Sequence, residues 1–235
     1  MKCAPIPKNE EKRLEALRRF QILESKSEQI FDDITFLASY VCEAPIALIS
    51  LIDSNRQWFK SRIGIEVTET PRDISFCGHA ILDQKTMIVQ DTLEDDRFSN
   101  NPLVTQNPHI RFYAGAPLMT TGSFALGTLC VIDRRPRSLT DSQQRALEAL
   151  SRQVSALIEM RNTVLDLKNA SEMINALKEL LPMCAWCRKI RDDNGNWEVL
   201  EMHLKNHSDI RVTHGICPEC SERELKLAGL KGSRA

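Results

Sequence analysis

One stretch of the sequence, residues 110–133, constrains the fold more than any other part of the chain. It has the pattern of a β-hairpin, with an apolar strand, a turn at Thr121-Gly122-Ser123 and a second apolar strand. Side chains of a strand alternate between the two faces of a sheet. One face carries four apolar side chains and the other carries Tyr113; the four are Phe112, Ala114, Ala116 and Leu118. We therefore expect a sheet covered on both faces, by helices on one side and by loops that can hold a small molecule on the other.

The composition indicates a protein that folds in the cytoplasm. Its 235 residues are 42% apolar, which is enough to build a core without disulfides. The first residues lack the apolar run of a signal peptide, and no uninterrupted stretch of about 18 apolar residues suggests a membrane span. The 31 basic and 32 acidic side chains nearly balance and form no basic stripe. We therefore expect neither nucleic acid nor a membrane among the partners of this chain.

Upstream of the hairpin, the spacing of apolar residues predicts two helices. Residues 9–23 form a charged helix for which Asn9 is a suitable N-cap. Residues 28–42 form a second helix. Its apolar face combines residues at steps of three and four: Ile30, Phe31, Ile34, Leu37, Ala38 and Val41.

Strand signals follow the second helix. A buried strand is predicted at residues 46–52, a turn follows, and residues 57–61 return beside it. Between residues 64 and 109 the pattern loosens, with one short strand at 87–89 and helical turns after Gly78. Long irregular segments with aromatic and apolar residues are typical of ordered functional loops, so we expect this segment to form a ligand shell.

After the hairpin, the sequence predicts one long helix. Thr140 and Gln143 have capping-box spacing, and no proline or glycine interrupts the chain from there to Leu181. The first part has a face suited to packing on the sheet: Leu147, Leu150, Val154, Leu157 and Ile158. The second part has the seven-residue repeat of a coiled coil: Met160, Thr163, Leu167, Ala170, Ile174, Leu177 and Leu181. We predict a homodimer through residues 160–181; the alternative is that this helix packs on the C-terminal module of the same chain.

Residues 9–165 resemble a GAF domain, a ligand-sensing relative of the PAS fold. The resemblance rests on the hairpin and on the segments Phe31-Asp32, 46–53, 56–61, 69–72, 75–81, 95–98 and 101–104. It implies an α+β domain in which an antiparallel sheet of about six strands has helices on one face and ligand loops on the other. It also implies a role in bacterial signal transduction.

The last part of the chain resembles a short four-cysteine tail that follows PAS, GAF and receiver domains in bacterial signalling proteins. We therefore divide the chain into an N-terminal arm, a GAF domain, a helical linker, a four-cysteine module and a flexible tail, at residues 1–8, 9–158, 159–181, 182–225 and 226–235. No phosphate-binding glycine loop or kinase-like segment follows the long helix. We expect signalling through a protein partner rather than through a catalytic output domain of its own.

The eight cysteines divide into two groups by spacing. Cys3, Cys42, Cys77 and Cys130 are scattered, whereas the other four form two Cys-x-x-Cys pairs: Cys184 with Cys187, and Cys217 with Cys220. Such pairs are typical of a closed tetrahedral zinc site, because each can lie on a tight turn with both sulfurs directed at one ion. We predict structural zinc bound by these four thiolates, with His214 as an alternative ligand and a thiol redox switch as an alternative role.

Candidate ligand-binding residues lie mostly in the loop segment. Aromatic side chains there can line an apolar pocket, and an arginine can bind a carboxylate or phosphate through its guanidinium fork. The predicted set is Trp58, Phe76, Cys77, His79, Arg97, Phe98, Arg111 and Tyr113. For Arg97 the alternative is a capped turn at Asp95-Asp96-Arg97-Phe98 with Phe98 as an anchor. Ordinary core is the alternative for the aromatic residues, to which Phe59 also belongs.

Cys77 and His79 also form a candidate catalytic pair. A thiolate beside an imidazole is a common nucleophile, although side chains two residues apart diverge where a helix begins. A buried cysteine next to a hydrogen-bonded histidine is the simpler expectation. In chromophore-binding GAF relatives a histidine directly follows the cysteine, whereas here Gly78 lies between Cys77 and His79.

Three functions follow from this sequence. We expect a cytoplasmic sensor or adaptor that binds a small molecule or senses redox state and that is not an enzyme. The alternatives are a thiol-dependent reductase of the free methionine sulfoxide type that uses Cys77, and a zinc-bearing transcriptional regulator. Zinc is the expected metal; no motif identifies the ligand of the GAF pocket or the downstream partner.

Overall fold

The structure is a computed structural model that describes residues 1–178, 182–192, 195–207 and 215–228. Two compact units make up the chain, Met1–Asn169 and Ala170–Ala235. The boundary between them lies within the helix that was predicted from residue 140 onward, so the predicted linker, residues 159–181, contributes to both units. Two of the residues singled out above, Leu181 and His214, lie outside the described residues.

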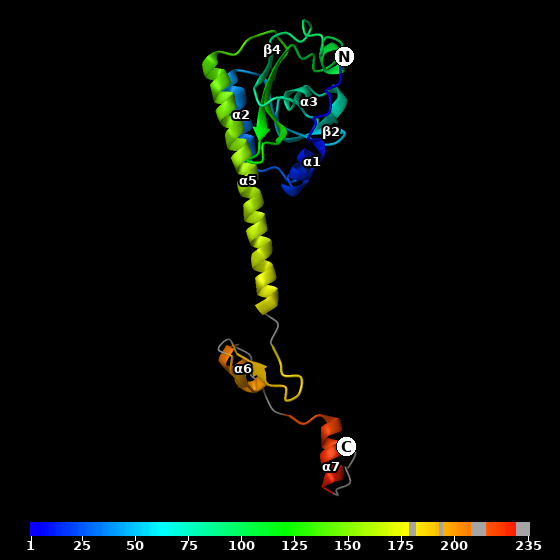
Figure 1. Ribbon diagram of the computed structural model, residues 1–235, viewed down its shortest axis with the longest axis vertical. Coiled ribbons are helices and arrows are strands. Elements are labelled where there is room, and N and C mark those ends of the chain that lie inside the picture. Colours follow the sequence, from blue (N-terminus) through cyan, green and yellow to red (C-terminus); the bar gives the residue numbers. More distant parts are fainter. Residues whose placement is uncertain (179–181, 193–194, 208–214, 229–235) are drawn as a thin grey trace. The chain divides into compact units, whose positions relative to one another are not determined.

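A six-stranded antiparallel sheet forms the centre of the first unit (Figure 1), in the order β3-β2-β1-β6-β5-β4. This is the sheet that the resemblance implied. Its strands are β1 (Ile46–Ile52), β2 (Arg56–Ile63), β3 (Glu69–Pro71), β4 (Met87–Val89), β5 (Phe112–Met119) and β6 (Ala125–Asp133). The strands predicted at 46–52 and 87–89 have these bounds, and β2 is longer at both ends than predicted.

The hairpin of β5 and β6 separates two cores, as its alternation predicted. Phe112, Ala114, Ala116 and Leu118 lie in the core beneath the helices, and Tyr113 lies in the core on the opposite face. The two strands pair with Gly115 opposite Cys130 and Tyr113 opposite Ile132. Cys130 therefore faces the same side of the sheet as Tyr113.

Three helices supply the core on the first face: α1 (Glu10–Arg19), α2 (Gln29–Cys42) and α5 (Asp141–Lys178). Helices α2 and α5 lie side by side (Figure 1), since Gln143 Nε2 donates to the Val41 carbonyl at one end of α2. Arg161 binds Glu28 at the other end. The predicted sheet-facing residues of α5 are confirmed: Leu147, Val154 and Ile158 are buried, and Leu150 and Leu157 pack against the same core.

The helix starts follow the sequence signals in one case and not in the other. The capping box of α5 is confirmed, because Gln143 N donates to Thr140 Oγ1 over 3.2 Å and Thr140 N donates to Gln143 Oε1 over 3.0 Å. Asn9 stands at the N-cap position of α1, but its side chain accepts no capping hydrogen bond. Glu10 ties this end of α1 down instead, through Arg13 and Arg72.

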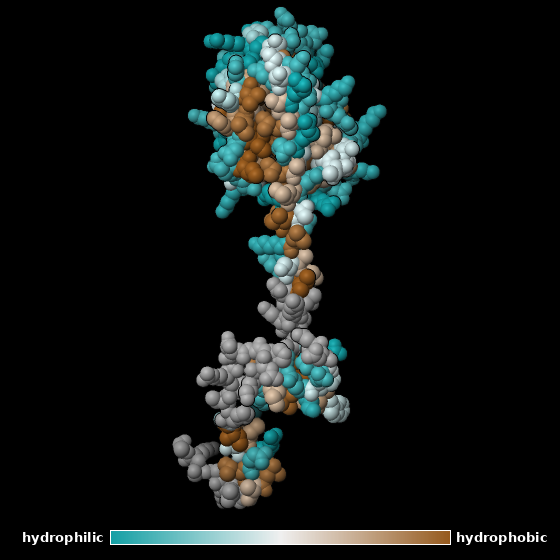
Figure 2. Space-filling view, turned by 90° about the vertical axis from the view of Figure 1, so that its left-hand side faces the viewer, coloured by the Kyte–Doolittle hydropathy of each residue, from teal (hydrophilic) through white to brown (hydrophobic). Residues whose placement is uncertain are grey.

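The predicted apolar face of α2 is wrong in part. Phe31, Ile34 and Ala38 are buried against the sheet, but Ile30, Leu37 and Val41 stay between 37% and 47% exposed. The apolar arc of this helix is wider than the sheet can cover, and Thr35 and Cys42 complete the buried stripe. An apolar strip on α2 is therefore left on the surface (Figure 2).

Short helices and loops cover the second face. They comprise a 3₁₀ turn at Arg72–Ile74, α3 (Phe76–Ala80) and α4 (Pro102–Thr105), together with the segments that join them. Phe76, Cys77 and Ala80 of α3 enter a core with Phe98, Tyr113 and Cys130. The segment between residues 64 and 109 is thus ordered, and α3 begins two residues before Gly78 rather than after it.

In the second unit, a two-stranded sheet pairs β7 (Ile190–Arg191) with β8 (Trp197–Glu198). Two helices follow, α6 (Leu200–His207) and α7 (Pro218–Leu227). Across all of the described residues, no helix combines the length and the apolar character needed to cross a bilayer.

Candidate functional site: a pocket over the sheet

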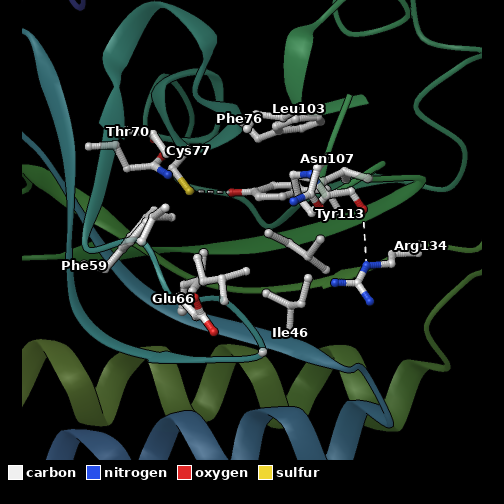
Figure 3. Close-up of a pocket in the computed structure, with 18 residues that line it drawn as sticks. Ile46, Phe59, Glu66, Thr70, Phe76, Cys77, Leu103, Asn107, Tyr113 and Arg134 are labelled. Carbon is white, nitrogen blue, oxygen red and sulfur yellow. Dashed lines mark hydrogen bonds between the residues drawn. The ribbon is translucent and has the colours of Figure 1, made fainter. Parts of the chain in front are cut away.

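A pocket of about 530 Å³ lies between the sheet and the loops of the second face (Figure 3). Its size falls within the range of small-molecule sites, about 300–1,000 Å³. Most of the wall is apolar: Ile46, Leu48, Phe59, Ile65, Val67, Phe76, Leu103, Pro108, Ile110, Tyr113 and Ile132. The polar residues on the wall are Gln57, Glu66, Thr70, Asn107 and Arg134, with Cys77 between Thr70 and the Tyr113 hydroxyl (Figure 3).

Two of these polar residues carry buried acceptor atoms without a protein partner. Gln57 of β2 and Thr70 of β3 face each other across the two strands. In the described part of the chain, neither Gln57 Oε1 nor Thr70 Oγ1 makes a hydrogen bond. A buried polar atom without a partner costs about 1–3 kcal/mol, so these two atoms are suited to a ligand that donates hydrogen bonds.

Cys77, Cys130 and Tyr113 form a polar cluster at one wall of the pocket. The Sγ atoms of Cys77 and Cys130 lie 3.8 Å apart, and the Tyr113 hydroxyl donates to Cys77 Sγ over 3.3 Å (Figure 3). All three side chains are at most 1% exposed. The description of Cys77 and Cys130 as scattered was therefore wrong. Helix α3 carries Cys77 and lies over β6, which carries Cys130.

Gly115 lets Tyr113 take this position. A Cβ atom at Gly115 would collide with the Tyr113 hydroxyl and ring carbons. The ring therefore lies along β5 over the glycine, and its hydroxyl reaches Cys77. Phe76 stacks on the ring of Tyr113 at 5.2 Å and on that of Phe98 at 4.1 Å, so the phenol ring belongs to an aromatic stack.

The cluster shifts the ionisation of its members. Burial alone would raise the pKa of Cys77, but the Cys130 thiol and the hydroxyls of Ser50, Thr128 and Tyr113 favour the thiolate and lower the pKa to about 7. The neighbouring Cys77 and burial raise the pKa of Cys130. Burial, followed by the charge on Cys77, raises the pKa of Tyr113. One thiol of the pair is therefore poised to ionise while the other keeps its proton.

The structure brings three of the eight predicted ligand residues, Phe76, Cys77 and Tyr113, to the pocket wall. Phe98 lies fully buried behind Phe76, in the same core but away from the pocket. His79 diverges from Cys77, as expected at the start of a helix, and its Nε2 contacts the Lys2 carbonyl at 3.0 Å. Burial lowers the pKa of His79.

The remaining three predicted residues lie elsewhere. Trp58 points to the helical face and packs against that core. Arg97 is held by Asp95, whose side chain also accepts from the Arg97 backbone, so the capped turn describes this segment. Arg111 forms a bidentate pair with Asp91, at 2.6 and 2.9 Å. Neither guanidinium lies on the pocket wall.

Sequence reasoning missed the second thiol of this site and the polar residues of the pocket wall: Cys130, Gln57, Glu66, Thr70, Asn107 and Arg134. Counting the hairpin register from the turn would have missed Cys130, because the pairing shifts by one residue between Pro117 and Met119: from the pair Met119–Ala125 the count puts Leu129 opposite Gly115, whereas Cys130 lies there. Arg134 follows β6 directly and donates to the Pro108 carbonyl at the pocket edge (Figure 3). Gln57 and Thr70 carry no distinctive local signal.

In the second unit, the predicted metal-binding pair Cys184 and Cys187 lies in a turn, and the pair Cys217 and Cys220 lies at the start of α7, where Cys217 is the N-cap. Cys187 N lies 3.5 Å from Cys184 Sγ, and Cys220 N lies 3.4 Å from Cys217 Sγ. These backbone N–H groups lower the pKa of Cys184 and of Cys217, which suits thiolate ligands. Among the described residues, no group of three or more His, Cys, Asp or Glu side chains is positioned to hold one ion.

Comparison with known proteins places this architecture in a family. Residues 27–158, more than half of the chain, match the GAF domain family. This chain belongs to the GAF domain family.

Individual known proteins are similar to parts of this chain. A cyclic di-GMP phosphodiesterase of Pseudomonas aeruginosa is 42% identical over 165 residues, which cover 69% of this chain and 28% of the relative. The chain thus spans well under a third of the length of that relative. The GAF domain of PixJ from Thermosynechococcus elongatus, in its blue-light absorbing form, superposes with a TM-score of 0.50 at 14% identity and covers 67% of this chain and 94% of that one.

A GAF domain from an Acinetobacter phosphoenolpyruvate-protein phosphotransferase is similar as well. It has a TM-score of 0.49 and 19% identity, and the match covers 66% of this chain and 98% of that domain.

Proposed function

We propose that this chain is a cytoplasmic signalling module that binds a small molecule in its GAF pocket and passes the signal to a protein partner. The ligand has an apolar body and at least one hydrogen-bond donor. The apolar wall contacts the body, and Gln57 Oε1 and Thr70 Oγ1 accept from the donor. The observation that carries this proposal is the pair of buried acceptors without partners in a pocket whose wall is mostly apolar.

The route of the signal starts at the pocket wall. Tyr113 and Cys130 belong to the β5–β6 hairpin, and β6 leads through Thr140 into α5. Helix α5 is tied to the start of α2 by Arg161 and Glu28, and Glu28 also accepts from Lys60 of β2. A shift of the strands below the ligand would therefore reach α5 through its connection to β6 and through the contacts of Glu28 with Lys60 and Arg161.

A second copy of this chain is the first partner that we propose. Several large apolar side chains of α5 are exposed, and their spacing includes the predicted seven-residue repeat: Met160, Val164, Leu167, Met173 and Ile174. The apolar strip on α2, made of Ile30, Phe36, Leu37, Tyr40 and Val41, is exposed as well (Figure 2). Parallel association of two α5 helices would bury the first set. Leu181, which extends the repeat, lies outside the described residues.

The similarity to a cyclic di-GMP phosphodiesterase supports a regulatory setting, because that larger protein joins a segment like this one to an activity named for a signalling nucleotide. We propose that the chain itself regulates and does not catalyse. In this proposal, zinc bound by the four thiolates of the second unit holds the module that docks the downstream partner.

Binding of the apolar anionic dye anilinonaphthalene sulfonate to the full chain tests the pocket. We expect saturable binding at one site, and Leu103→Trp, which fills the pocket from α4, should weaken it at least tenfold. Leu93→Trp adds the same indole at an exposed position outside the pocket and should leave binding unchanged. Equal binding by both variants would contradict the proposed site. Native mass spectrometry of the chain as purified would identify a ligand retained from the cell.

A second function is favoured by the Cys77–Cys130 contact. A thiol-dependent reductase of the free methionine sulfoxide type needs a reactive cysteine on a pocket wall and a second thiol within reach, and both conditions hold here. Turnover of free methionine sulfoxide in a thiol-coupled assay, lost in Cys77→Ser, would establish this enzyme. Absence of turnover in the reduced wild-type chain would leave the sensor as the function.

A further inference from the structure

We propose that Cys77 and Cys130 form a redox-active dithiol that a small hydroperoxide entering the pocket oxidises to a disulfide. The Sγ atoms of the two thiols lie 3.8 Å apart, in van der Waals contact. Cys77 lines the pocket and Cys130 lies behind it. This site goes beyond the proposed function, because its oxidation requires no resident ligand.

The geometry allows the bond to form with a small movement. A disulfide brings two sulfur atoms to about 2.05 Å, so closure requires less than 2 Å of approach. Cys130 lies in β6, which is paired with β1 on one side and with β5 on the other, so it is held in place. Cys77 lies on the five-residue helix α3. We therefore expect α3 to supply most of the movement.

The chemistry of the site separates the roles of the two thiols. The Cys77 thiolate attacks one oxygen of the hydroperoxide, the O–O bond breaks, and the alcohol leaves after taking up the proton that Cys77 released. The Cys130 thiol then attacks the Cys77 sulfenic acid. The S–S bond forms, and water leaves with the Cys130 proton. Two thiols are oxidised by two electrons in total, and one hydroperoxide is reduced to an alcohol and water.

The surroundings favour this order of events. The Tyr113 hydroxyl, 3.3 Å from Cys77 Sγ, donates a hydrogen bond that stabilises the thiolate. The lowered pKa of Cys77 and the raised pKa of Cys130 agree with Cys77 as the attacking thiolate. Cys42 provides a contrast within the same domain: it is buried on the helical face, burial raises its pKa to about 11, and its thiol contacts the Gln143 carbonyl instead of a second cysteine.

Oxidation would also change the pocket. Phe76 precedes Cys77 on α3, lines the pocket and stacks on Tyr113. Movement of α3 toward β6 would shift this ring and break the hydrogen bond between Tyr113 and Cys77. The dithiol therefore couples the redox state of the chain to the shape of the proposed ligand site.

Peptide mapping of the full chain tests the proposal. The reduced protein is treated with one equivalent of tert-butyl hydroperoxide, quenched with acid, unfolded, alkylated with N-ethylmaleimide and digested. We expect a cross-linked peptide pair that contains Cys77 and Cys130, that lacks two hydrogens and that dithiothreitol separates. Cys130→Ser should abolish the cross-link and leave Cys77 as a sulfenic or sulfinic acid. Tyr113→Phe should slow the reaction several-fold, whereas Cys42→Ser should leave its rate unchanged.

Two results would overturn the proposal. One is full alkylation of both Cys77 and Cys130 after hydroperoxide treatment, whether or not the cysteines of the second unit have reacted. The other is an unaltered set of Cys77 products in Cys130→Ser. Circular dichroism and urea unfolding of each variant show whether the domain is folded, and the Tyr113→Phe rate provides a readout that keeps every cysteine. Dye binding by the oxidised chain is measured separately. A negative result for the ligand pocket therefore leaves the peptide-mapping test of the Cys77–Cys130 disulfide unaffected.

Discussion

Glu28 and Arg161 form an ion pair, with 3.1 Å between Oε1 and Nε, that joins the N-cap of α2 to the middle of α5. The same carboxylate oxygen accepts from Lys60 Nζ over 2.7 Å. The Lys60 side chain is fully buried, and it also donates to Ser25 Oγ and to the Lys26 carbonyl. One acidic residue thus neutralises a buried lysine of the sheet and holds the helix that leaves the domain.

Replacing Glu28 with glutamine should therefore destabilise the first unit. The change leaves the Lys60 ammonium buried without its counter-charge. We expect this to lower the free energy of unfolding by about 1–3 kcal/mol, less than for a fully buried pair, because Glu28 is 36% exposed and Lys60 keeps two other acceptors. Urea unfolding at neutral pH measures this loss. Glu24→Gln is the matched control, because Glu24 pairs with Arg56 at the surface and is 71% exposed, so its removal should cost less than about 1 kcal/mol. Equal losses in the two variants would contradict the structural role of Glu28.

Charge substitutions on the exposed seam of α5 should separate the proposed dimer. Leu167→Glu and Ile174→Glu place carboxylates at positions seven residues apart, where two copies would bring like charges together. Sedimentation velocity of the full chain should then show a shift from dimer to monomer at micromolar concentration. Asn169→Glu adds the same charge at another exposed position of the helix and should leave the dimer intact. A monomeric wild-type chain would refute the coiled coil.

Gly115→Ala should disturb the pocket from within the sheet. The added methyl group would occupy the position of the Tyr113 hydroxyl, so the ring must move and its hydrogen bond to Cys77 is lost. We expect a loss of about 1–3 kcal/mol in unfolding free energy, typical of overpacking. The alkylation rate of Cys77 at neutral pH should fall as well, because its thiolate loses a donor. Gly122→Ala is the control: the nearest side chain there is Phe124, with ring carbons at 3.2 and 3.3 Å that can rotate away.

Glu10 should make the domain sensitive to acid. Burial opposes its charge, but hydrogen bonds and attraction from Arg13 and Arg72 outweigh burial and lower the pKa of Glu10 from 4.5 to about 2. A carboxylate with a lowered folded-state pKa stabilises the fold above its unfolded pKa. This stabilisation, on the order of 2–3 kcal/mol, is lost as the pH falls from about 4.5 toward 2.

Unfolding free energies measured between pH 6 and pH 2, in about half-unit steps, check this prediction. Wild type should lose more stability over that window than Glu10→Gln, which cannot titrate at this position. Glu11→Gln, at the exposed neighbouring position, should follow wild type. Parallel curves for wild type and Glu10→Gln would mean that the pairs with Arg13 and Arg72 contribute nothing to acid stability.

Metal analysis should find about one zinc ion per chain if the four thiolates share a site. Cys217→Ser should then release the metal and unfold the second unit, which the fluorescence of Trp186 and Trp197 reports. The first unit should stay folded, and Cys3→Ser should change neither metal content nor fluorescence, since Cys3 is exposed in the other unit. A metal-free chain with a Cys184–Cys187 disulfide would instead support the redox switch.

Local patterns in the sequence determined the framework of the first unit. Alternation in the hairpin assigned Phe112 to one core and Tyr113 to the other, because successive side chains of a strand point to opposite faces of the sheet. Capping chemistry located the start of α5 at Thr140, since that hydrogen bonding involves residues only three positions apart. These features are local, and a single sequence contains the information that they need.

The residues that line the pocket are determined by contacts between parts of the chain that are distant in sequence, which no local pattern reveals. Arg97 and Arg111 had the right chemistry for an anionic ligand, but each is held by an aspartate, and the chain path carries both away from the pocket wall. On α2, only the packed sheet decided which part of a wide apolar arc stays exposed. Cys77 and Cys130 meet because α3 lies across β6 and Gly115 leaves room for the Tyr113 ring, although 53 residues separate them in the sequence. Spacing along the chain determines secondary structure, whereas the chemistry of this pocket depends on which strands pair and on what crosses above them.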